Sequence, residues 1–340
     1  MSYRQSNVVT GHHGVDLVAD LYPQSSTEKP SVILLHGGGQ NRHAWAKTAR
    51  TIHAAGHHVV AYDARGHGDS SWDPAGRYET EDLAYDLLAV RERYCGRRPA
   101  VAVGASIGGM TTLIAHRIAP PRLWAGVVLV DVTPRMEIDG ARRVVQFMSA
   151  HPDGFATLHD AGDVIAAYNP HRPRPDSVDG LTKVLRQRDD GRWVWRWDPA
   201  FITTKLDVMH ADPANSEQRF RQMADHLLDG ARRITAPTLL VRGAMSDLVS
   251  PDTVNEFLTA DPHAEAVDVC NTGHMVAGDY NDAFTTAVLT FLERIPPIPQ
   301  PRQAPDQRPP TCPTTPCSST QSIRTTTTKP SPTPDNDASS

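Results

Sequence analysis

Short apolar runs alternate with longer amphipathic stretches over most of the chain. Six runs have the length and composition of buried strands, and these are Ser31–Leu35, His57–Tyr62, Ala100–Val103, Ala125–Val130, Thr238–Arg242 and Glu265–Val269. Four stretches carry apolar residues near helical spacing, and these are Glu81–Tyr94, Ser106–Ile118, Ser250–Leu258 and Tyr280–Leu292. Such alternation predicts an α/β fold with a mostly parallel sheet covered by helices on both faces. Val8–Thr10 and Asp16–Leu21 are expected to add a leading antiparallel hairpin.

The alternation stops in the middle of the chain and again near its end. The stretch from Pro134 to Ala236 is rich in helical patterns, over Arg142–Ala150, Gly162–Tyr168, Gly180–Arg188 and Glu217–Leu228. From Pro296 onward the residues are mainly Pro, Thr, Ser and Gln, which cannot bury enough surface to fold. The pattern therefore predicts a core over 1–133 and 237–295, a helical cap over 134–236 and a disordered tail over 296–340.

Composition narrows the class of protein only a little. The formal net charge is −5 and no long stretch is dominated by one sign, so a nucleic-acid or membrane-surface partner is not expected. The N-terminus has no apolar run of signal-peptide length, and no later apolar run is long enough to span a membrane. The four cysteines are too few and too scattered for a disulfide framework. We expect a cytoplasmic protein, and the sequence leaves its oligomeric state open.

The segment Gly104–Gly109 reads G-A-S-I-G-G between a predicted strand and a predicted helix. In this context G-x-S-x-G is typical of a nucleophile elbow, a tight turn that pushes the serine out above the sheet. Glycines flank the serine because the turn leaves no room for their side chains. Ser106 is therefore the candidate nucleophile.

A second glycine-rich loop, His36–Gly39, follows the first strand of the parallel sheet. Acyl transfer needs two N–H donors aimed at the developing oxyanion. We expect one from Ile107, the residue after the serine, and the other from Gly38 rather than Gly39. Phosphate binding is disfavoured, since neither P-loop nor dinucleotide-binding spacing is present.

A serine nucleophile needs a base and an acid that orients the base. His274 follows the strand Glu265–Val269, and Asp247 follows the strand Thr238–Arg242, so both are expected at the carboxyl edge of the sheet. The order Ser106, Asp247, His274 is nucleophile, acid, base. Asp131 ends the strand after the nucleophile helix and is the rival candidate for the acid. Alternatively, Asp131 lines the substrate pocket.

Other polar residues are interpreted as structural, not as catalytic or metal-binding. The run from Asp63 to Ser70 contains His67 and Asp69, and it is interpreted as a charged turn held by local hydrogen bonds, with Asp63 and Arg65 as a pair. The histidines His12, His13, His57 and His58 have no spacing that supplies carboxylate partners, so no metal site is expected. No cofactor is expected either.

These segments together resemble an α/β-hydrolase fold enzyme. The matching segments are HGGG at 36–39, DARGHGDS at 63–70, GASIGG at 104–109, SDLVSP at 246–251 and NTGHMVAGD at 271–279. The resemblance implies an eight-stranded sheet with a helical cap after the sixth strand, and it is nearest to the epoxide-hydrolase-like and haloperoxidase-like branches. Epoxide hydrolases and haloalkane dehalogenases of this fold use an aspartate nucleophile, whereas this chain has Ser106.

A serine nucleophile favours an ester or lactone hydrolase that forms an acyl-enzyme. A C–C bond hydrolase, a perhydrolase (cofactor-free haloperoxidase) and a non-catalytic small-molecule receptor of this fold remain alternatives. The expected substrate is a small acyl compound of moderate hydrophobicity. Cap residues that are candidates for its pocket, or alternatively for packing inside the cap, are Phe147, Met148, Trp193, Trp195 and Trp197.

Overall fold

The computed structural model describes residues 4–23, 28–170, 177–210, 213–274, 276 and 282–298. The predicted tail beyond residue 298 lies outside the described residues. So do residues 280 and 281, at the predicted start of the last helix.

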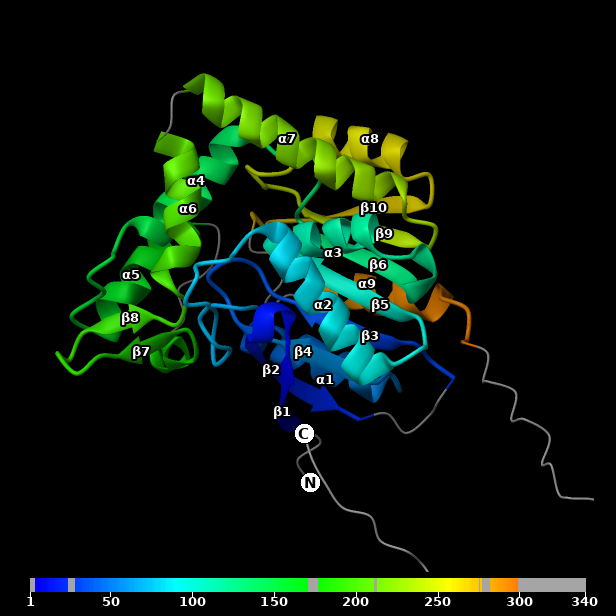
Figure 1. Ribbon diagram of the computed structural model, residues 1–340, viewed down its shortest axis with the longest axis horizontal. Helices are drawn as coiled ribbons and strands as arrows, with labels where there is room; N and C mark the ends of the chain where they lie inside the picture. Colours follow the sequence, from blue (N-terminus) through cyan, green and yellow to red (C-terminus); the bar gives the residue numbers. More distant parts are fainter. Residues whose placement is uncertain are drawn as a thin grey trace, which may run out of the picture. The chain divides into compact units, whose positions relative to one another are not determined.

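A sheet of eight strands forms the centre of the fold, as predicted (Figure 1). Its strands are β1 (Gln5–Thr10), β2 (Asp16–Tyr22), β3 (Ser31–Leu35), β4 (Val59–Tyr62), β5 (Ala100–Ala105), β6 (Trp124–Val130), β9 (Thr238–Gly243) and β10 (Ala264–Val269). The order is β1-β2-β4-β3-β5-β6-β9-β10. The leading hairpin joins the sheet antiparallel to β4, and the strands from β4 to β10 are parallel to one another. The carboxyl ends of these parallel strands therefore lie at one edge.

Helices cover both faces of this sheet, and two clusters of buried apolar side chains lie beneath them. The helices of the core are α1 (Ala46–Ala54), α2 (Thr80–Cys95), α3 (Ile107–Ile118), α8 (Pro251–Ala260) and α9 (Asp282–Arg294), with short 3-10 turns η1 (His12–Gly14), η2 (Arg42–Trp45) and η3 (Pro121–Leu123). On one face α2, α3 and α8 contribute Leu87, Leu113 and Phe257. On the other, α1 and α9 contribute Ile52 and Phe284.

Helix α1 is the element of the core that the sequence pattern does not predict. Its sequence AKTARTIHA contains little besides alanine and Ile52 that is apolar. The helix nevertheless buries Thr48, Ala49 and Ile52 against the sheet. Because these residues are mostly small, the apolar stripe is too narrow to be recognised in the sequence. The helix is stabilised by its packing against the sheet.

The insert between β6 and β9 is mainly helical, with a small sheet at its far end. Its elements are α4 (Ile138–Ser149), α5 (Leu158–Tyr168), η4 (Asp179–Lys183), β7 (Leu185–Gln187), β8 (Trp193–Trp195), α6 (Pro199–His210) and α7 (Pro213–Arg232). The helix predicted over Gly180–Arg188 is wrong, since this stretch forms η4 and then β7. The reason is turn chemistry: Gly191 has φ 82°, and the Arg188 N–H donates to the Arg192 carbonyl at 2.8 Å, closing a β7–β8 hairpin.

Helix α7 begins beside α6 and ends against the core helix α3 (Figure 1). Leu227 and Ala231 near its end are fully buried in the same cluster as Leu113 of α3. Gly230 lies so close that a Cβ there would collide with the backbone of Leu113. The last part of the predicted cap therefore covers the core.

The first residues of the predicted tail pack against the core. Ile298 is buried, and its N–H donates to the Glu28 carbonyl at 3.0 Å. At least one residue that we assigned to the tail, Ile298, therefore has an apolar place in the fold. Among the residues that the structure describes, no helix combines the length and apolarity needed to cross a membrane.

Candidate active site

Ser106 occupies the turn between β5 and α3 in a strained conformation. Its φ of 47° and ψ of −115° lie in a region that L-residues rarely adopt. The Ser106 N–H donates to the Val130 carbonyl at 3.0 Å, which fixes the turn against β6. A Cβ on Gly108 would lie 2.6 Å from the Leu35 carbonyl oxygen, and one on Gly104 would collide with the Gly108 carbonyl. The close packing explains why glycines flank the serine.

The imidazole of His274 meets the carboxylate of Asp131. Nδ1 of His274 lies 2.7 Å from Oδ2 of Asp131. The carboxylate is 1% exposed and also accepts the Gly243 N–H at 2.9 Å and the Ser246 hydroxyl at 2.6 Å. With Nδ1–H donated to Asp131, Nε2 of His274 is left as the basic nitrogen.

Asp247, which we expected in this role, is not the partner of His274. Its Oδ2 lies 2.6 Å from Nη1 of Arg143, and its side chain is 40% exposed. In the turn after β9 it is Ser246 that points inward to Asp131, so the next residue points outward. The rival acid Asp131 therefore takes the place that we gave to Asp247.

Sheet register places Ser106 beside Asp131. Ala105 at the end of β5 pairs with Val130 at the end of β6, and the residues that follow the two strands are Ser106 and Asp131. Like the serine, Asp131 has a positive φ, of 50°. No hydrogen bond joins the Ser106 hydroxyl to the His274 imidazole here. Hydrogen bonds of this kind often shorten only in the substrate complex.

The glycine loop after β3 lies against the nucleophile. A Cβ on Gly37 would lie 3.6 Å from Cβ of Ser106. The Gly37 N–H donates to Oε1 of Gln40 at 3.0 Å, and the Gly39 N–H donates to Nε2 of His67 at 3.2 Å. The N–H groups of Gly38 and Ile107 have no hydrogen-bond partner among the described residues. The two predicted oxyanion donors are thus the ones left available.

Two buried histidines, His36 and His67, hold this loop in place. The sequence places both in loops, but it does not reveal this role. His67 accepts the Gly39 N–H at Nε2 and donates from Nδ1 to the Arg65 carbonyl at 3.0 Å. His36 donates from Nδ1 to the Gly37 carbonyl at 2.8 Å and accepts the Ala64 N–H at 2.9 Å. Burial lowers the pKa of His67 to about 3 and also lowers the pKa of His36. Both rings are therefore neutral near pH 7, which each needs in order to accept a hydrogen bond.

His67→Phe is expected to lower kcat/KM for ester hydrolysis about 10- to 100-fold, because it would displace the Gly38 N–H, which we expect to be an oxyanion donor. The loss should fall mainly on kcat, since the oxyanion forms only in the transition state. Steady-state kinetics check this. His67→Gln keeps an acceptor for Gly39 and should retain more activity; equal losses in both variants would contradict the bracing role.

Buried neutral histidines also predict acid sensitivity of the fold. His116 of α3 is 1% exposed and stacks on Trp124, and burial lowers its pKa to about 4. Unfolded histidine binds a proton near pH 6.5, so the unfolded state binds more protons below that pH and the free energy of unfolding falls. We expect each such histidine to contribute a fall of up to about 1.4 kcal/mol per pH unit between about pH 6 and pH 5.

Urea unfolding across this pH range measures the effect. His116→Leu removes one titrating group and should make the fall less steep, whereas His159→Leu, a change at an exposed histidine of α5, should not. An unchanged slope in His116→Leu would contradict the assignment.

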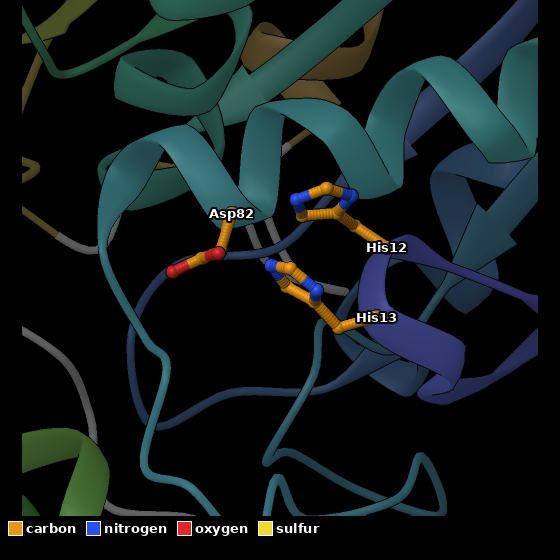
Figure 2. A group of neighbouring side chains, drawn as sticks. All are labelled: His12, His13 and Asp82. Carbon is orange, nitrogen blue, oxygen red and sulfur yellow. The ribbon is translucent and has the colours of Figure 1, made fainter.

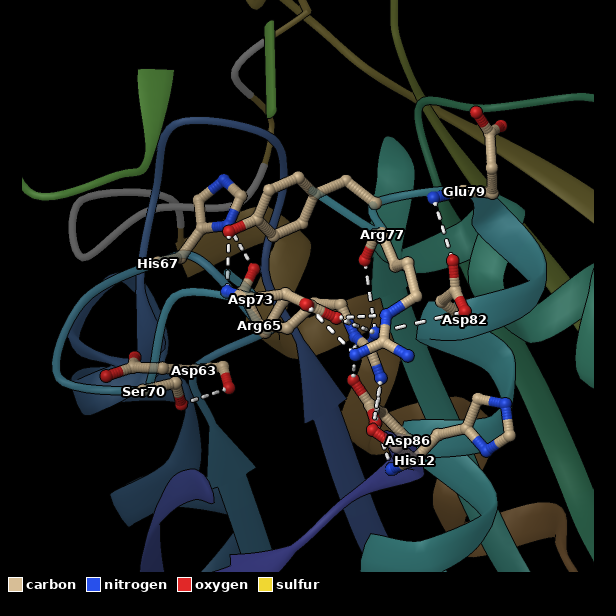
Figure 3. Close-up of polar contacts among 12 residues, drawn as sticks. His12, Asp63, Arg65, His67, Ser70, Asp73, Arg77, Glu79, Asp82 and Asp86 are labelled. Carbon is tan, nitrogen blue, oxygen red and sulfur yellow. Dashed lines mark hydrogen bonds and ion pairs between the residues drawn. The ribbon is translucent and has the colours of Figure 1, made fainter. Parts of the chain in front are cut away.

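The charged turn after β4 is held by local hydrogen bonds to Asp63, as expected, but Asp63 and Arg65 each pair with a residue of another element instead of with each other. Asp63 pairs with the guanidinium of Arg42. Arg65 pairs with Asp86 of α2 at 2.6 Å, as Figure 3 shows. Arg65 is fully buried and also donates to the carbonyls of His12 and Arg77. The sequence could not identify these partners, since both come from other elements.

The insert brings apolar side chains to the glycine loop. A Cβ added to Gly38 would lie 3.6 Å from Sδ of Met148 and 3.9 Å from the ring of Phe201. A Cβ added to Gly39 would lie 3.1 Å from the ring of Trp197. Met148 and Trp197 are predicted pocket residues, whereas Phe201 of α6 was missed. The segment Gly66–Gly68 bonds to residues 196–198, which ties the insert to the turn that carries His67.

The other predicted pocket residues lie further along the insert. Trp195 stacks on Trp197 with 4.5 Å between ring centroids. Phe147 stacks on Tyr168 at 4.1 Å. Trp193 packs in a separate cluster with Phe155, so packing inside the insert describes it better than contact with the glycine loop.

One expectation about the histidines is wrong. We expected His12 and His13 to lack a carboxylate partner, but Asp82 on the first turn of α2 lies beside both (Figure 2). Helix α2 lies beside the β1–β2 turn in the fold. This contact could not be predicted from the sequence, because Asp82 is far from both histidines along the chain.

Comparison with known proteins identifies the family. A family model for the alpha/beta hydrolase fold matches residues 30–279. Esterase Rv0045c of Mycobacterium tuberculosis is 30% identical over 270 residues, which cover 78% of this chain and 83% of the relative. The mouse (Mus musculus) sn-1-specific diacylglycerol lipase ABHD11 is 25% identical over 276 residues, covering 77% and 81%.

Solved structures agree with these matches. A structure of the M. tuberculosis esterase Rv0045c superposes with a TM-score of 0.64 at 28% identity, covering 86% of this chain and 93% of that one. An alpha/beta hydrolase from Novosphingobium aromaticivorans gives a TM-score of 0.69 at 23% identity, covering 87% and 100%, and shows the fold alone. The curated relatives support the expectation of an ester-cleaving enzyme. This chain belongs to the alpha/beta hydrolase fold family.

Proposed function

We propose that this enzyme hydrolyses carboxylic esters, lactones among them, through an acyl-enzyme on Ser106. One observation carries the proposal: the buried contact of 2.7 Å between Asp131 and His274, in sheet register with the strained elbow of Ser106. A buried carboxylate on Nδ1 makes Nε2 of the imidazole a base, which a serine hydroxyl needs in order to react.

In the proposed reaction Ser106 Oγ attacks the substrate carbonyl while His274 Nε2 takes the hydroxyl proton. The N–H groups of Ile107 and Gly38 donate to the tetrahedral oxyanion, and each is worth on the order of 3 kcal/mol of barrier. The imidazolium then protonates the departing alcohol. His274 Nε2 then takes a proton from a water molecule whose oxygen attacks the acyl carbon. It returns that proton to Ser106 Oγ as the ester bond breaks, which releases the carboxylic acid and free Ser106. Asp131 orients the ring and stabilises its charged form throughout.

Side chains beside the glycine loop indicate the kind of acyl group. Met148, Trp197 and Phe201 place apolar surface against Gly38 and Gly39. They belong to one buried cluster with Ile107, the residue after the nucleophile. An apolar wall at this point favours a moderately hydrophobic acyl chain over a charged one.

The experiment that tests the proposal combines turnover with labelling of the nucleophile. p-Nitrophenyl butyrate is offered to the wild type before and after treatment with a fluorophosphonate, which phosphonylates an activated serine. We expect hydrolysis to stop when one phosphonyl group per chain is bound, and peptide mass spectrometry to place that group on Ser106. Hydrolysis that continues after full labelling, or a label on another residue, would overturn the proposal.

A further inference from the structure

His12, His13 and Asp82 bring three potential metal ligands together away from the catalytic serine. The two histidines occupy the turn η1 between β1 and β2, and Asp82 lies in the first turn of α2. One ligand atom from each residue lies within 4.8 Å of the others. Figure 2 shows both imidazole rings extending from the turn toward the carboxylate on the helix.

Neighbouring contacts hold the backbone of His12 and the side chain of Asp82 in place. The His12 N–H donates to Oδ1 of Asp86 at 2.8 Å, and its carbonyl accepts from Arg65 at 2.9 Å (Figure 3). Oδ2 of Asp82 accepts the Glu79 N–H at 3.2 Å, as part of the capping box of α2. Ligands fixed by such outer contacts lose little freedom when a metal binds.

His13 adopts a backbone conformation that favours glycine. Its φ of 58° and ψ of 23° lie in the left-handed region, where a histidine is strained and a glycine is not. Strain of this kind persists where the surrounding structure or a function requires the side chain. The His13 ring is exposed and lies 3.8 Å from the His12 ring, between centroids, so burial does not explain it.

The ring nitrogens of both histidines are available for a ligand. Within the described part of the chain neither imidazole forms a hydrogen bond or a salt bridge. A neutral imidazole has one nitrogen lone pair, and two such lone pairs with one carboxylate oxygen make an N₂O set.

The charges around the group favour a divalent cation. Nη1 of Arg65 approaches Oδ1 of Asp82 at 3.9 Å, but its charge is already engaged by Asp86 at 2.6 Å and by Asp73 at 3.4 Å. The second guanidinium, Arg77, binds Asp73 at 2.9 Å. Three carboxylates therefore face two guanidinium groups, which leaves the cluster one negative charge when both histidines are neutral.

We propose that His12, His13 and Asp82 bind one divalent transition-metal ion of the zinc class. Two imidazoles and a carboxylate suit Zn²⁺, Co²⁺, Ni²⁺ or Cu²⁺, whereas Mg²⁺ and Ca²⁺ prefer oxygen ligands alone. The exposed side of His13 leaves room for water to complete the coordination. A bound ion ties the β1–β2 turn to α2, and it stabilises the folded chain by binding to it alone.

The test measures binding of Zn²⁺ and its effect on thermal unfolding in the full chain. Calorimetric titration of the wild type is expected to give one tight site per chain, and Zn²⁺ is expected to raise the melting temperature. His12→Gln and His13→Gly should each weaken that site more than about 100-fold, which exceeds the effect of losing an outer contact. Both should also abolish the rise in melting temperature.

His13→Gly separates a lost ligand from a lost fold. Glycine fits the backbone at position 13, so without metal this variant should unfold at the wild-type temperature or above it. His159→Ala, at an exposed histidine of α5, is the matched control and should bind Zn²⁺ like the wild type.

The chain contains 16 histidines, so binding elsewhere, His274 included, is the competing explanation. Unchanged Zn²⁺ affinity in His13→Gly and His12→Gln overturns the proposal. So does a wild type that binds Zn²⁺ no more tightly than a variant that carries both substitutions. Zn²⁺ that inhibits ester hydrolysis equally in the wild type and in both variants, with equal calorimetric affinity in all three, would assign the ion to His274 and overturn the proposal.

Discussion

Asp131→Asn is expected to lower kcat/KM for ester hydrolysis about 10⁴-fold, whereas Asp247→Asn should leave it close to the wild-type value. An amide at position 131 presents N–H donors to Nδ1 of His274, where the carboxylate accepted a hydrogen bond from Nδ1–H. The ring then holds its proton on Nε2 and cannot act as base toward Ser106. Asp247 loses only an exposed contact with Arg143, which contributes little.

The paired substitutions are informative because both change one carboxylate to an amide of equal size. Steady-state hydrolysis of p-nitrophenyl butyrate gives the two rates, and thermal unfolding shows whether each variant is folded. Asp131 also accepts from Gly243 and Ser246, so some loss of stability is expected at that position. A large loss of activity in Asp247→Asn with an active Asp131→Asn would restore the assignment made from sequence.

Ser106→Ala is expected to lower kcat for ester hydrolysis about 10⁴- to 10⁶-fold. Without Oγ no acyl-enzyme forms, and any remaining rate comes from water held near the oxyanion donors. KM should change little, since the substrate still meets the apolar wall and the N–H groups. The variant should also resist labelling by a fluorophosphonate.

Ser149→Ala is a matched control for that substitution, because it removes a serine hydroxyl from α4 that binds only its own helix. It should keep both activity and labelling. If Ser106→Ala hydrolyses the ester at the wild-type rate, another residue is the nucleophile and the elbow has a structural role only.

The sheet was predictable because its strands are marked locally. Runs such as Val101–Val103 and Val127–Val130 are buried on both faces, so they are continuously apolar. Helix α1 escaped prediction because Ile52 is the only large apolar residue of its buried face, and its neighbours Thr48 and Ala49 are common in any context. The β7–β8 hairpin escaped because its first strand lies inside Gly180–Arg188, the stretch that was interpreted as a helix.

The candidate site was predictable to the extent that single positions determine it. Ser106 has flanking glycines, and His274 follows a strand at the expected edge. The choice between Asp131 and Asp247 depends on which side chain of a turn faces inward, and Ser246 decides this. His67 and Asp82 act through partners distant in sequence, which no local pattern reveals.

The path of α7 has a consequence for modularity. The insert enters through a short segment after β6, but it leaves through a helix whose final turns belong to the core: Leu227, Ala231 and the nearby Ile234 are buried there. Insert and core thus share one cooperative folding unit at this helix. An insert exchanged between relatives at residues 134 and 236 would remove the cover of α3, the helix that begins at the nucleophile. A graft that preserves the core has to join within α7, before Leu227.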